Sequence, residues 1–260
     1  MRISVITPTL NQGEFIEETI RSVVSQDHPD VEHIVIDGGS SDGTQDILAR
    51  YPHLRWLSER DTGQSNAINK GFRMATGDVV AWLNSDDYYD RNILGAVNGY
   101  FESHPGCMML YGDITYVSRE GRALYTLTGE SISYDALLLS PDIVRQPSSF
   151  WRKQALEDLG GLDERLHLVM DFDLILRCAR KQRPQYIAKN LSFFRWYDQS
   201  KTATMMGKQA RELYRVYRKN GVRLGYRQYR LLLGRYLDSL SRHNPVRTGF
   251  SLFRKRGAPA

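Results

Sequence analysis

The sequence has few cysteines and no long apolar run, and both absences narrow the class of protein. Its two cysteines, Cys107 and Cys178, stand in no CxxC pair, so we expect buried free thiols and not a zinc site or disulfide framework. No apolar stretch approaches the roughly 20 residues that span a bilayer. The start, Met1-Arg2-Ile3-Ser4, enters a strand pattern directly and lacks the pattern of a signal peptide, which predicts a cytoplasmic protein.

The glycine fingerprint of dinucleotide-binding proteins is also missing. A G-x-G-x-x-G turn normally follows the first strand of such proteins, whereas this chain has Thr7-Pro8-Thr9-Leu10-Asn11-Gln12-Gly13. A nicotinamide oxidoreductase is therefore disfavoured. Hydrophobic residues make up 41% of the 260 residues and aromatic residues 11%, which is typical of a globular chain with a sizeable core.

Acidic residues outnumber basic ones in the first part of the chain, and basic residues are concentrated at its end. Residues 205–260 contain 14 Lys and Arg but two acids, Glu212 and Asp238, whereas the remaining residues contain 21 basic and 28 acidic groups. The net charge of +5 therefore hides two differently charged parts. This asymmetry predicts a tail that engages an anionic surface, either a membrane or a nucleic acid.

Short β-branched runs alternate with helical patterns over the first 100 residues. Apolar residues spaced three or four apart predict a helix over 14–26, and further helices are expected from residue 44 and over 64–74. Strands are predicted at 3–7, 33–36, 54–57, 79–83 and 148–151, further strands within 108–127, and helices at 153–159 and 171–180. Alternating strands and helices indicate an α/β protein with a mostly parallel central sheet.

Polar residues follow the predicted strands where ligands of such sheets collect, beyond the carboxyl ends. Thr7, Asp37, Asp61 and the pair Asp86-Asp87 all lie at this edge. Adjacent carboxylates provide the hard oxygen ligands that Mg²⁺ and Mn²⁺ prefer, usually alongside substrate phosphates. An acidic pair alone is more often a solvated turn or a helix cap, so the neighbouring motifs decide its interpretation.

Five ordered motifs together resemble the family 2 glycosyltransferases, which are inverting enzymes of the GT-A fold. The motifs are Val5-Ile6-Thr7-Pro8-Thr9, Val35-Ile36-Asp37-Gly38-Gly39-Ser40-Ser41-Asp42-Gly43-Thr44, Asp61-Thr62-Gly63-Gln64-Ser65, Ala67-Ile68-Asn69-Lys70-Gly71 and Asn84-Ser85-Asp86-Asp87. The resemblance covers about residues 2–202. It implies a GT-A catalytic domain over 1–204, with a donor half over about 1–100 and an acceptor half over about 101–204, followed by a basic helical extension over 205–260.

By this resemblance, the chain is a metal-dependent hexosyltransferase that moves a sugar from a nucleoside diphosphate to an acceptor hydroxyl in cell-surface glycan or polysaccharide assembly. The implied donor is a nucleotide sugar, with uridine the commonest base among relatives, and the implied cofactor is Mn²⁺ or Mg²⁺. The donor contacts it implies are Thr7, Pro8, Thr9, Asp37, Gly38, Asp61, Gln64, Asn66, Lys70, Asn84 and Asp86, and the metal ligand is Asp87.

The resemblance also implies a general base, and Asp171 stands at its position in His167-Leu168-Val169-Met170-Asp171. Members of the family often have Glu where this chain has Met170. The plain alternative is that Asp171 caps the predicted helix. We interpret Asp173 as structural, with Arg177 as its partner four residues on.

The last motif differs from the family pattern. Tyr197 replaces a His that commonly contacts metal or phosphate, which puts the metal affinity in question because a tyrosine of pKa about 10 is a poor ligand. Arg195 and Lys201 fit either a phosphate contact or a solvated face. These departures keep an alternative function open, a nucleotide-sugar-binding scaffold or pseudoenzyme in a glycan-assembly complex.

The basic tail contains an amphipathic pattern. Its apolar positions are Tyr226, Tyr229, Leu233, Tyr236, Leu237 and Leu240, with Arg223, Arg227 and Arg230 between them. This pattern predicts a peripheral membrane contact at the inner face of the membrane, with a glycan or lipid-linked acceptor. The same face fits a second subunit or the catalytic domain equally well. Nucleic acid is disfavoured, because no recognised binding module accompanies the charge.

Overall fold

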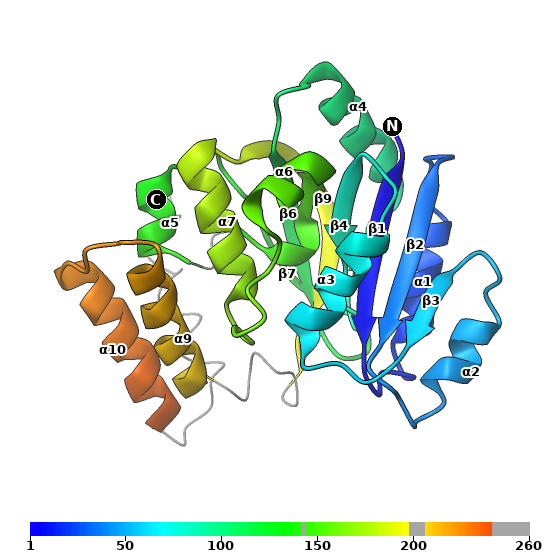
Figure 1. The fold of residues 1–260 in the computed structure, drawn as a ribbon, viewed down its shortest axis with the longest axis horizontal. Helices are drawn as coiled ribbons and strands as arrows, with labels where there is room; N and C mark the ends of the chain where they lie inside the picture. Colours follow the sequence, from blue (N-terminus) through cyan, green and yellow to red (C-terminus); the bar gives the residue numbers. More distant parts are fainter. Residues whose placement is uncertain (142–143, 198–205, 241–260) are drawn as a thin grey trace. The chain divides into compact units, whose positions relative to one another are not determined.

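The computed structural model describes residues 1–141, 144–197 and 206–240, with the backbone alone for 206–207 and 235–240. It contains two compact units, Met1–Trp196 and Tyr197–Ala260 (Figure 1). The boundary expected after residue 204 lies outside the described residues and stays a prediction. None of the described helices has both the length and the apolar character needed to cross a membrane.

Strands and helices alternate at the start of the first unit. Its first elements are β1 Ile3–Thr9, α1 Ile16–Val24, β2 Val31–Asp37, α2 Thr44–Ala49, β3 Arg55–Ser58, α3 Gln64–Met74, β4 Val79–Trp82, β5 Tyr88–Tyr89 and α4 Leu94–Ser103. Its later elements are β6 Met109–Val117, β7 Ala123–Leu127, α5 Tyr134–Leu139, a 3-10 turn Gln146–Ser148, β8 Ser149–Arg152, α6 Lys153–Leu159, α7 Met170–Lys181 and β9 Gln185–Arg195.

Nine strands form one sheet within the described residues, in the order β3-β2-β1-β4-β8-β6-β9-β5, with β7 paired to β6. Strands β3, β2, β1 and β4 are parallel, which confirms the expected parallel arrangement at the start of the chain. The later strands mix the parallel pair β6–β9 with antiparallel pairs that include β4–β8 and β6–β8. The α/β fold expected from the sequence is therefore confirmed, and the sheet is more mixed after β4 than before it.

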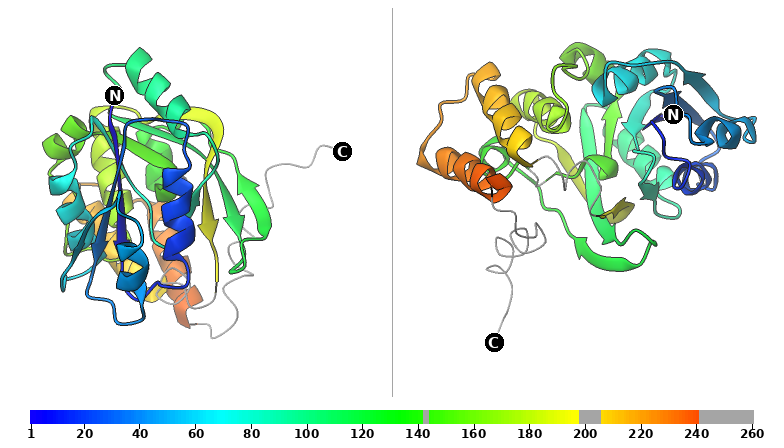
Figure 2. Two further views of the ribbon diagram at one scale, coloured as in Figure 1. Left: turned by 90° about the vertical axis from the view of Figure 1, so that its right-hand side faces the viewer. Right: turned by 90° about the horizontal axis from the view of Figure 1, so that it is seen from below.

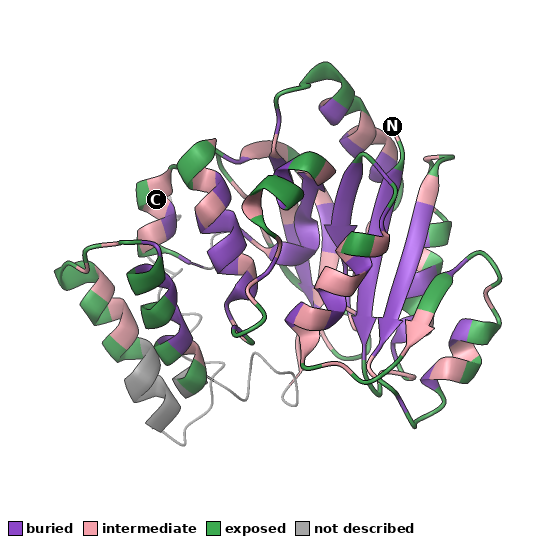
Figure 3. Cartoon of the chain, in the orientation of Figure 1, coloured by how far each residue is buried: buried purple, intermediate pink, exposed green. Residues whose placement is uncertain are grey.

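Helices cover both faces of this sheet (Figures 1 and 2). Helices α1 and α4 pack on one face, where Val23, Val97 and Phe101 join Ile3 and Val5 in one buried cluster. Helix α3 lies on the opposite face, against β1 and β2. Strands β1, β2 and β4 are buried over most of their length (Figure 3), because both faces are covered. Their carboxyl ends are thereby held rigidly at one edge.

The approach of α3 to β1 depends on Gly71. A Cβ atom at this position would overlap the side chain of Ile6, lying 2.8 Å from its Cγ1. Both residues are buried, and Ile6 is fully so. Glycine is needed here for close packing and not for an unusual backbone angle.

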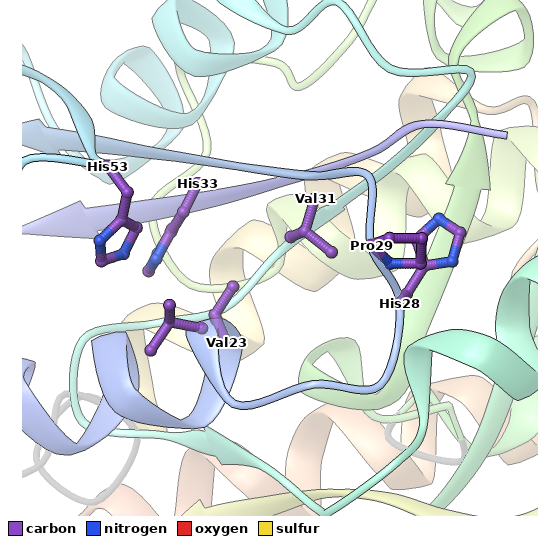
Figure 4. Close-up of a pocket in the computed structure, with 7 residues that line it drawn as sticks. Val23, His28, Pro29, Val31, His33 and His53 are labelled. Atoms are coloured by element: carbon purple, nitrogen blue, oxygen red, sulfur yellow. The ribbon is translucent and has the colours of Figure 1, made fainter.

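Strand β2 contains a buried histidine that contacts β1. His33 is 3% exposed, and its Nε2 lies 2.9 Å from the Thr7 hydroxyl of β1, while its Nδ1 has no hydrogen-bond partner among the described residues. The ring contributes to the lining of a cavity of about 180 Å³ that also includes Val23, His28 and His53 (Figure 4). Burial lowers the pKa of His33 to about 3, with a smaller contribution from His53. The ring is therefore neutral at every pH at which the protein is expected to work.

Over the described residues of the second unit there are two helices, α9 Met206–Lys219 and α10 Tyr226–Leu240. Four apolar side chains of α9 are buried, namely Ala210, Leu213, Val216 and Tyr217, whereas Tyr214 is 43% exposed. On α10, by contrast, Tyr226, Tyr229 and Leu233 are 76%, 56% and 56% exposed. The expected helical tail is thus present over 206–240, and its second helix presents aromatic and apolar side chains to solvent.

Replacing Gly71 with alanine is expected to destabilise the protein by about 1–3 kcal/mol, because the added methyl group overpacks the α3–β1 contact. The matched control is Gly99→Ala on the exposed side of α4, where an added Cβ meets nothing within 4 Å. This control should stabilise the protein by about 0.5–1 kcal/mol, since alanine is the better helix former. Urea unfolding measures both; equal destabilisation of the two variants would contradict the packing argument.

His33 is expected to make the protein less stable as the pH falls. The unfolded chain binds a proton near the ordinary His pKa of about 6.5, whereas the folded protein does so only near about 3. Stability is therefore complete above pH 6.5 and falls by up to about 1.4 kcal/mol per pH unit below it. The difference in slope between wild type and His33→Gln, measured by urea unfolding from pH 7 to 4.5, should approach one proton. The exposed His104→Gln control, which does not line the cavity beside His33, should leave the slope unchanged. Equal slopes for wild type and His33→Gln would contradict this prediction.

Candidate active site

The carboxyl ends of the parallel strands bring the predicted donor residues to one edge. The register of the sheet sets Thr9 of β1 opposite Asp37 of β2, and the Gly38 amide donates to the Thr9 carbonyl at 2.9 Å. Beyond β4, the Leu83 amide donates to the Ile6 carbonyl at 2.8 Å. The Asn84–Asp87 loop therefore leaves the sheet beside β1. This convergence is the one that parallel strands were expected to produce.

Asp37 organises the loop after β2. Its carboxylate is fully buried and accepts hydrogen bonds from the Ser40 amide, the Ser40 hydroxyl and the Ser58 hydroxyl, the last at 2.6 Å. Asp61 is half-buried and accepts from the Gly63 amide at 2.8 Å. A Cβ atom at Gly38 would lie 2.9 Å from Asp61 Oδ2, so these two predicted donor residues are in contact. Asp37 supports this corner, and Asp61 lies nearer its surface.

Amide side chains connect α3 to the acidic loop. Gln64 Nε2 donates to Asn84 Oδ1 at 2.8 Å, and Asn84 Nδ2 donates to Asp87 Oδ2 at 3.1 Å. Asn84 Nδ2 also lies 3.3 Å from Oε1 of Gln146, a buried residue whose Nε2 donates to the Trp82 carbonyl. These contacts orient Asn84 so that its amide donates to a carboxylate. A continuous series of hydrogen bonds therefore links three of the predicted site residues, Gln64, Asn84 and Asp87.

The two carboxylates of the acidic loop differ in exposure. Asp87 is 1% exposed, and its Oδ1 also accepts from the Arg195 amide at 3.0 Å, whereas Asp86 is half-buried. Burial and the nearby charge of Asp86 raise the pKa of Asp87 well above its usual range, against the hydrogen bonds that lower it. Two carboxylates at such proximity have a surplus of negative charge, which favours a neighbouring cation.

The acidic loop fits a divalent cation bound in part by substrate. No group of three His, Cys, Asp or Glu side chains placed to hold a metal occurs among residues 1–141, 144–197 and 206–240. Asp86 and Asp87 would supply one or two oxygen ligands, and a diphosphate with water would supply the others, as is usual for Mg²⁺. Asp86 is the more exposed of the two carboxylates, whereas both oxygens of the buried Asp87 accept hydrogen bonds. The role of Asp87 as metal ligand stays a prediction.

Thr19 and Arg195 hold this loop from outside the predicted set. The Thr19 hydroxyl on α1 contacts the carbonyls of Ser85 and Asp87 at 2.9 and 2.7 Å. Arg195, 3% exposed, donates through Nε to the Asp86 carbonyl at 3.0 Å and forms an ion pair with Glu18. The Arg195 side chain is therefore buried and bound to protein groups, and it does not lie on a solvated face. The sequence could have indicated Thr19, because it stands among the apolar positions of α1. It could not have indicated the role of Arg195, whose partners lie far away along the chain.

The two predicted threonine contacts differ in their hydrogen bonding. Thr7 is fully buried and directed at His33, as is typical of a core residue. Thr9 is 5% exposed, and its hydroxyl has no hydrogen-bond partner among the described residues. Pro8 lies buried between them in β1. Thr9 is therefore the threonine with hydrogen-bonding capacity to offer a ligand.

Two predicted residues of α3 contact acidic side chains. Asn66 Nδ2 donates to Glu164 Oε2 at 2.9 Å, and Lys70 Nζ lies 2.6 Å from Glu59 Oε1. Neither contact is to a residue of the predicted donor set. Their roles toward a nucleotide stay predictions.

The candidate base lies in the first turn of α7. Asp171 is half-buried, and its Oδ1 accepts from the Phe172 amide at 2.8 Å. Two residues on, Asp173 is fully buried and forms an ion pair with Arg177 Nε at 2.9 Å. The expected pairing of Asp173 with Arg177 is confirmed, although it is internal and not on the helix surface. Asp171 is the more accessible carboxylate of this turn.

Comparison with known proteins identifies the same motifs. The profile described as glycosyl transferase family 2 matches residues 4–158. A "PGL/p-HBAD biosynthesis glycosyltransferase" of Mycobacterium bovis (strain BCG / Pasteur 1173P2) is 32% identical over 181 residues, covering 67% of this chain and 68% of the relative. The match includes every strand of the parallel half and the acidic loop.

Solved structures agree on the fold. S. aureus TarS 1–349 in complex with UDP-GlcNAc gives a TM-score of 0.65 at 20% identity over 98% of this chain and 77% of that one. The mannosyltransferase PcManGT from Pyrobaculum calidifontis, in complex with GDP-Man and Mn²⁺, gives 0.62 at 19% identity over 98% and 81%. Both are GT-A transferases. The chain therefore belongs to glycosyl transferase family 2 and has the GT-A fold.

Proposed function

We propose that the chain transfers a sugar, with inversion, from a nucleoside diphosphate bound at the carboxyl edge of β1–β4 to an acceptor hydroxyl. The observation that supports this most directly is the linkage of Gln64, Asn84 and Asp87 beside the half-buried Asp86. Because Gln64 directly follows the turn from Asp61 to Gly63, this linkage connects the acidic loop to the corner formed by Gly38 and Asp61. Such a corner suits a ribose and a diphosphate at once.

In the proposed reaction the acceptor oxygen attacks the anomeric carbon while the bond from that carbon to the diphosphate breaks. Asp171 takes the proton of the acceptor hydroxyl, and the bonding electrons leave with the diphosphate. Asp86 and Asp87 would hold a divalent ion, which would supply positive charge to stabilise this leaving group. Asp37, Asp61 and Thr9 orient the nucleoside by hydrogen bonds or by holding the loops that contact it.

The donor we propose is a nucleotide sugar of the UDP type, with Mn²⁺ or Mg²⁺. The two structural neighbours were solved with UDP-GlcNAc and with GDP-Man and Mn²⁺, which supports the donor class without fixing the base or the sugar. The acceptor we propose is a glycan or lipid-linked hydroxyl of a cell-surface assembly pathway. The biosynthetic name of the mycobacterial relative supports that class.

We also propose that α10 contacts the anionic cytoplasmic leaflet of a membrane. Tyr226, Tyr229 and Leu233 are exposed on it, and Arg227 and Arg230 are exposed beside them. Aromatic and apolar side chains flanked by arginines suit the interface of an anionic bilayer, where each cation contributes about 1 kcal/mol. This contact would bring a lipid-linked acceptor close to the enzyme.

Calorimetric titration with UDP, GDP and dTDP, each with Mn²⁺, Mg²⁺ or chelator, tests the donor site. One diphosphate should bind in the presence of metal, and Asp86→Asn should weaken it at least tenfold because one oxygen ligand loses its charge. Asp171→Asn should bind within about twofold of wild type but lose about 10²–10⁴-fold in release of diphosphate from the nucleotide sugar. The exposed Asp46→Asn on α2 is the matched control and should change neither quantity. Binding of no diphosphate would refute the transferase proposal, and unchanged turnover in Asp171→Asn would remove its base.

Co-sedimentation with vesicles tests the membrane contact. The wild type should sediment with vesicles of phosphatidylserine and phosphatidylcholine, less so at high salt, and little with phosphatidylcholine alone. Arg227→Glu combined with Arg230→Glu should reduce that binding at least tenfold, because two attractive charges become repulsive. The matched control reverses Arg21 and Arg50, two exposed arginines of the first unit. Vesicle binding that is unchanged by salt and by charge reversal would contradict this proposal. If the wild type is a dimer and the α10 variant is not, the exposed face of α10 contacts a second copy of the chain.

A further inference from the structure

Helix α3 is joined to the chain segment that precedes α7 by a reciprocal pair of hydrogen bonds. Asn69 Nδ2 donates to the Leu162 carbonyl at 2.9 Å, and the Leu162 amide donates to Asn69 Oδ1 at 3.0 Å. The side-chain amide thus pairs with the backbone of Leu162 in both directions. Any displacement of this segment from α3 breaks two hydrogen bonds at once.

Two further side chains of α3 bind the same segment. Asn66 and Asn69 each donate to one carboxylate oxygen of Glu164, both at 2.9 Å. The buried Ser65 hydroxyl donates to the Leu166 carbonyl at 2.7 Å. We call Ser65, Asn66 and Asn69 the α3 clamp. Hydrogen bonds to an ionised carboxylate are stronger than neutral ones, and those from Asn69 and Asn66 lower the pKa of Glu164, which keeps it ionised.

The segment is shaped to reach this clamp. Gly160 and Gly161 have φ values of +75° and +66°, and a Cβ atom at Gly161 would lie 2.8 Å from Asn69 Oδ1. From α7, Arg177 donates to the Gly161 carbonyl at 2.7 Å while it pairs with Asp173. The segment is therefore held by α3 on one side and by α7, the helix of Asp171, on the other.

The same segment contacts the corner formed by Gly38 and Asp61, which we call the donor corner. A Cβ atom at Gly63 would lie 3.2 Å from His167 Nδ1, so His167 packs against the turn that begins at Asp61. The donor corner, the α3 clamp and the first turn of α7 are thus consecutive parts of one connected structure. The distance from a bound donor to Asp171 is set by the segment between them.

We infer that Asn69 is a positioning residue, which through Leu162 and Glu164 fixes Asp171 relative to the donor. Its side chain makes three of the four hydrogen bonds by which Asn66 and Asn69 hold the segment. The inference depends on the proposed role of Asp171 as general base. A base displaced by about 1 Å can lose about 10²-fold in rate without any change in donor binding.

The test compares Asn69→Ala and the isosteric Asn69→Asp with wild type. Asn69→Asp loses both donated hydrogen bonds and sets a second carboxylate beside Glu164. Both variants should lower kcat about 10- to 100-fold and leave the affinity for the donor diphosphate within about twofold. Hydrogen–deuterium exchange of the amides over 160–169 should become faster in both, which requires no activity to measure.

Three further comparisons make the result specific. Gln154→Ala on α6 removes an exposed amide that donates to the Asp158 carboxylate at 3.0 Å, a comparable interaction elsewhere, and should change neither kcat nor exchange over 160–169. Glu164→Gln keeps an oxygen acceptor for Asn69 and should retain more activity than Glu164→Ala. In the Asp171→Asn background, Asn69→Ala should lower the residual rate by no more than about twofold, because the group it positions is already gone.

Each contrary outcome has a distinct meaning. An equal loss from Asn69→Ala with and without Asp171 would overturn the inference, as would unchanged exchange over 160–169. A tenfold loss of diphosphate affinity at unchanged kcat would make Asn69 a donor contact instead. A wild type that binds diphosphate but releases none from any nucleotide sugar would refute the proposed function, and the inference with it.

Discussion

The buried cation Arg195 holds the acidic loop against β9 and α1, and the site depends on this corner of the structure. Burying a guanidinium is costly unless charge and hydrogen bonds compensate for the lost water. Here the Asp86 carbonyl, the Arg119 carbonyl and the Glu18 carboxylate all accept from it, and its own amide donates to Asp87. Strand β9, helix α1 and the acidic loop therefore meet at one residue. None of them can move without leaving a charge or a carbonyl unsatisfied.

That corner carries more negative charge than positive. The Glu18 carboxylate pairs with the Arg195 guanidinium, the Asp87 carboxylate accepts from the Arg195 backbone amide, and burial together with the nearby charge of Asp86 raises the pKa of Asp87. A site that is short of positive charge but already rigid favours a ligand that brings its own cation. A metal-bound diphosphate has that property, because the metal offsets the carboxylates and the phosphates together. The charge imbalance and the proposed chemistry therefore have one physical origin.

Local patterns predicted many helices and strands well and the partners of individual side chains poorly. Helix α6 was expected over 153–159 and lies there, whereas α4 was missed because Gly95 and Gly99 weaken its helical signal. The acidic loop and Gln64 were found from motifs, since each motif is a short run of residues directly after a strand. The orientation of Thr7 toward His33, and the burial of Arg195, depend on partners 26 to more than 100 residues away. No local pattern contains that information.

The α3 clamp shows why motif residues need not all contact a ligand. The Asn69-Lys70 stretch follows the donor loop in sequence, which suggests nucleotide contacts, yet Asn69 binds the backbone of Leu162 more than 90 residues later. A transferase must hold two substrates in fixed relation, and in this chain a helix of the donor half binds the segment leading to the candidate base. If donor binding orders the turn at Gly63, the same free energy must favour donor binding whenever the segment is already in place. The donor half and the base would then be coupled through α3.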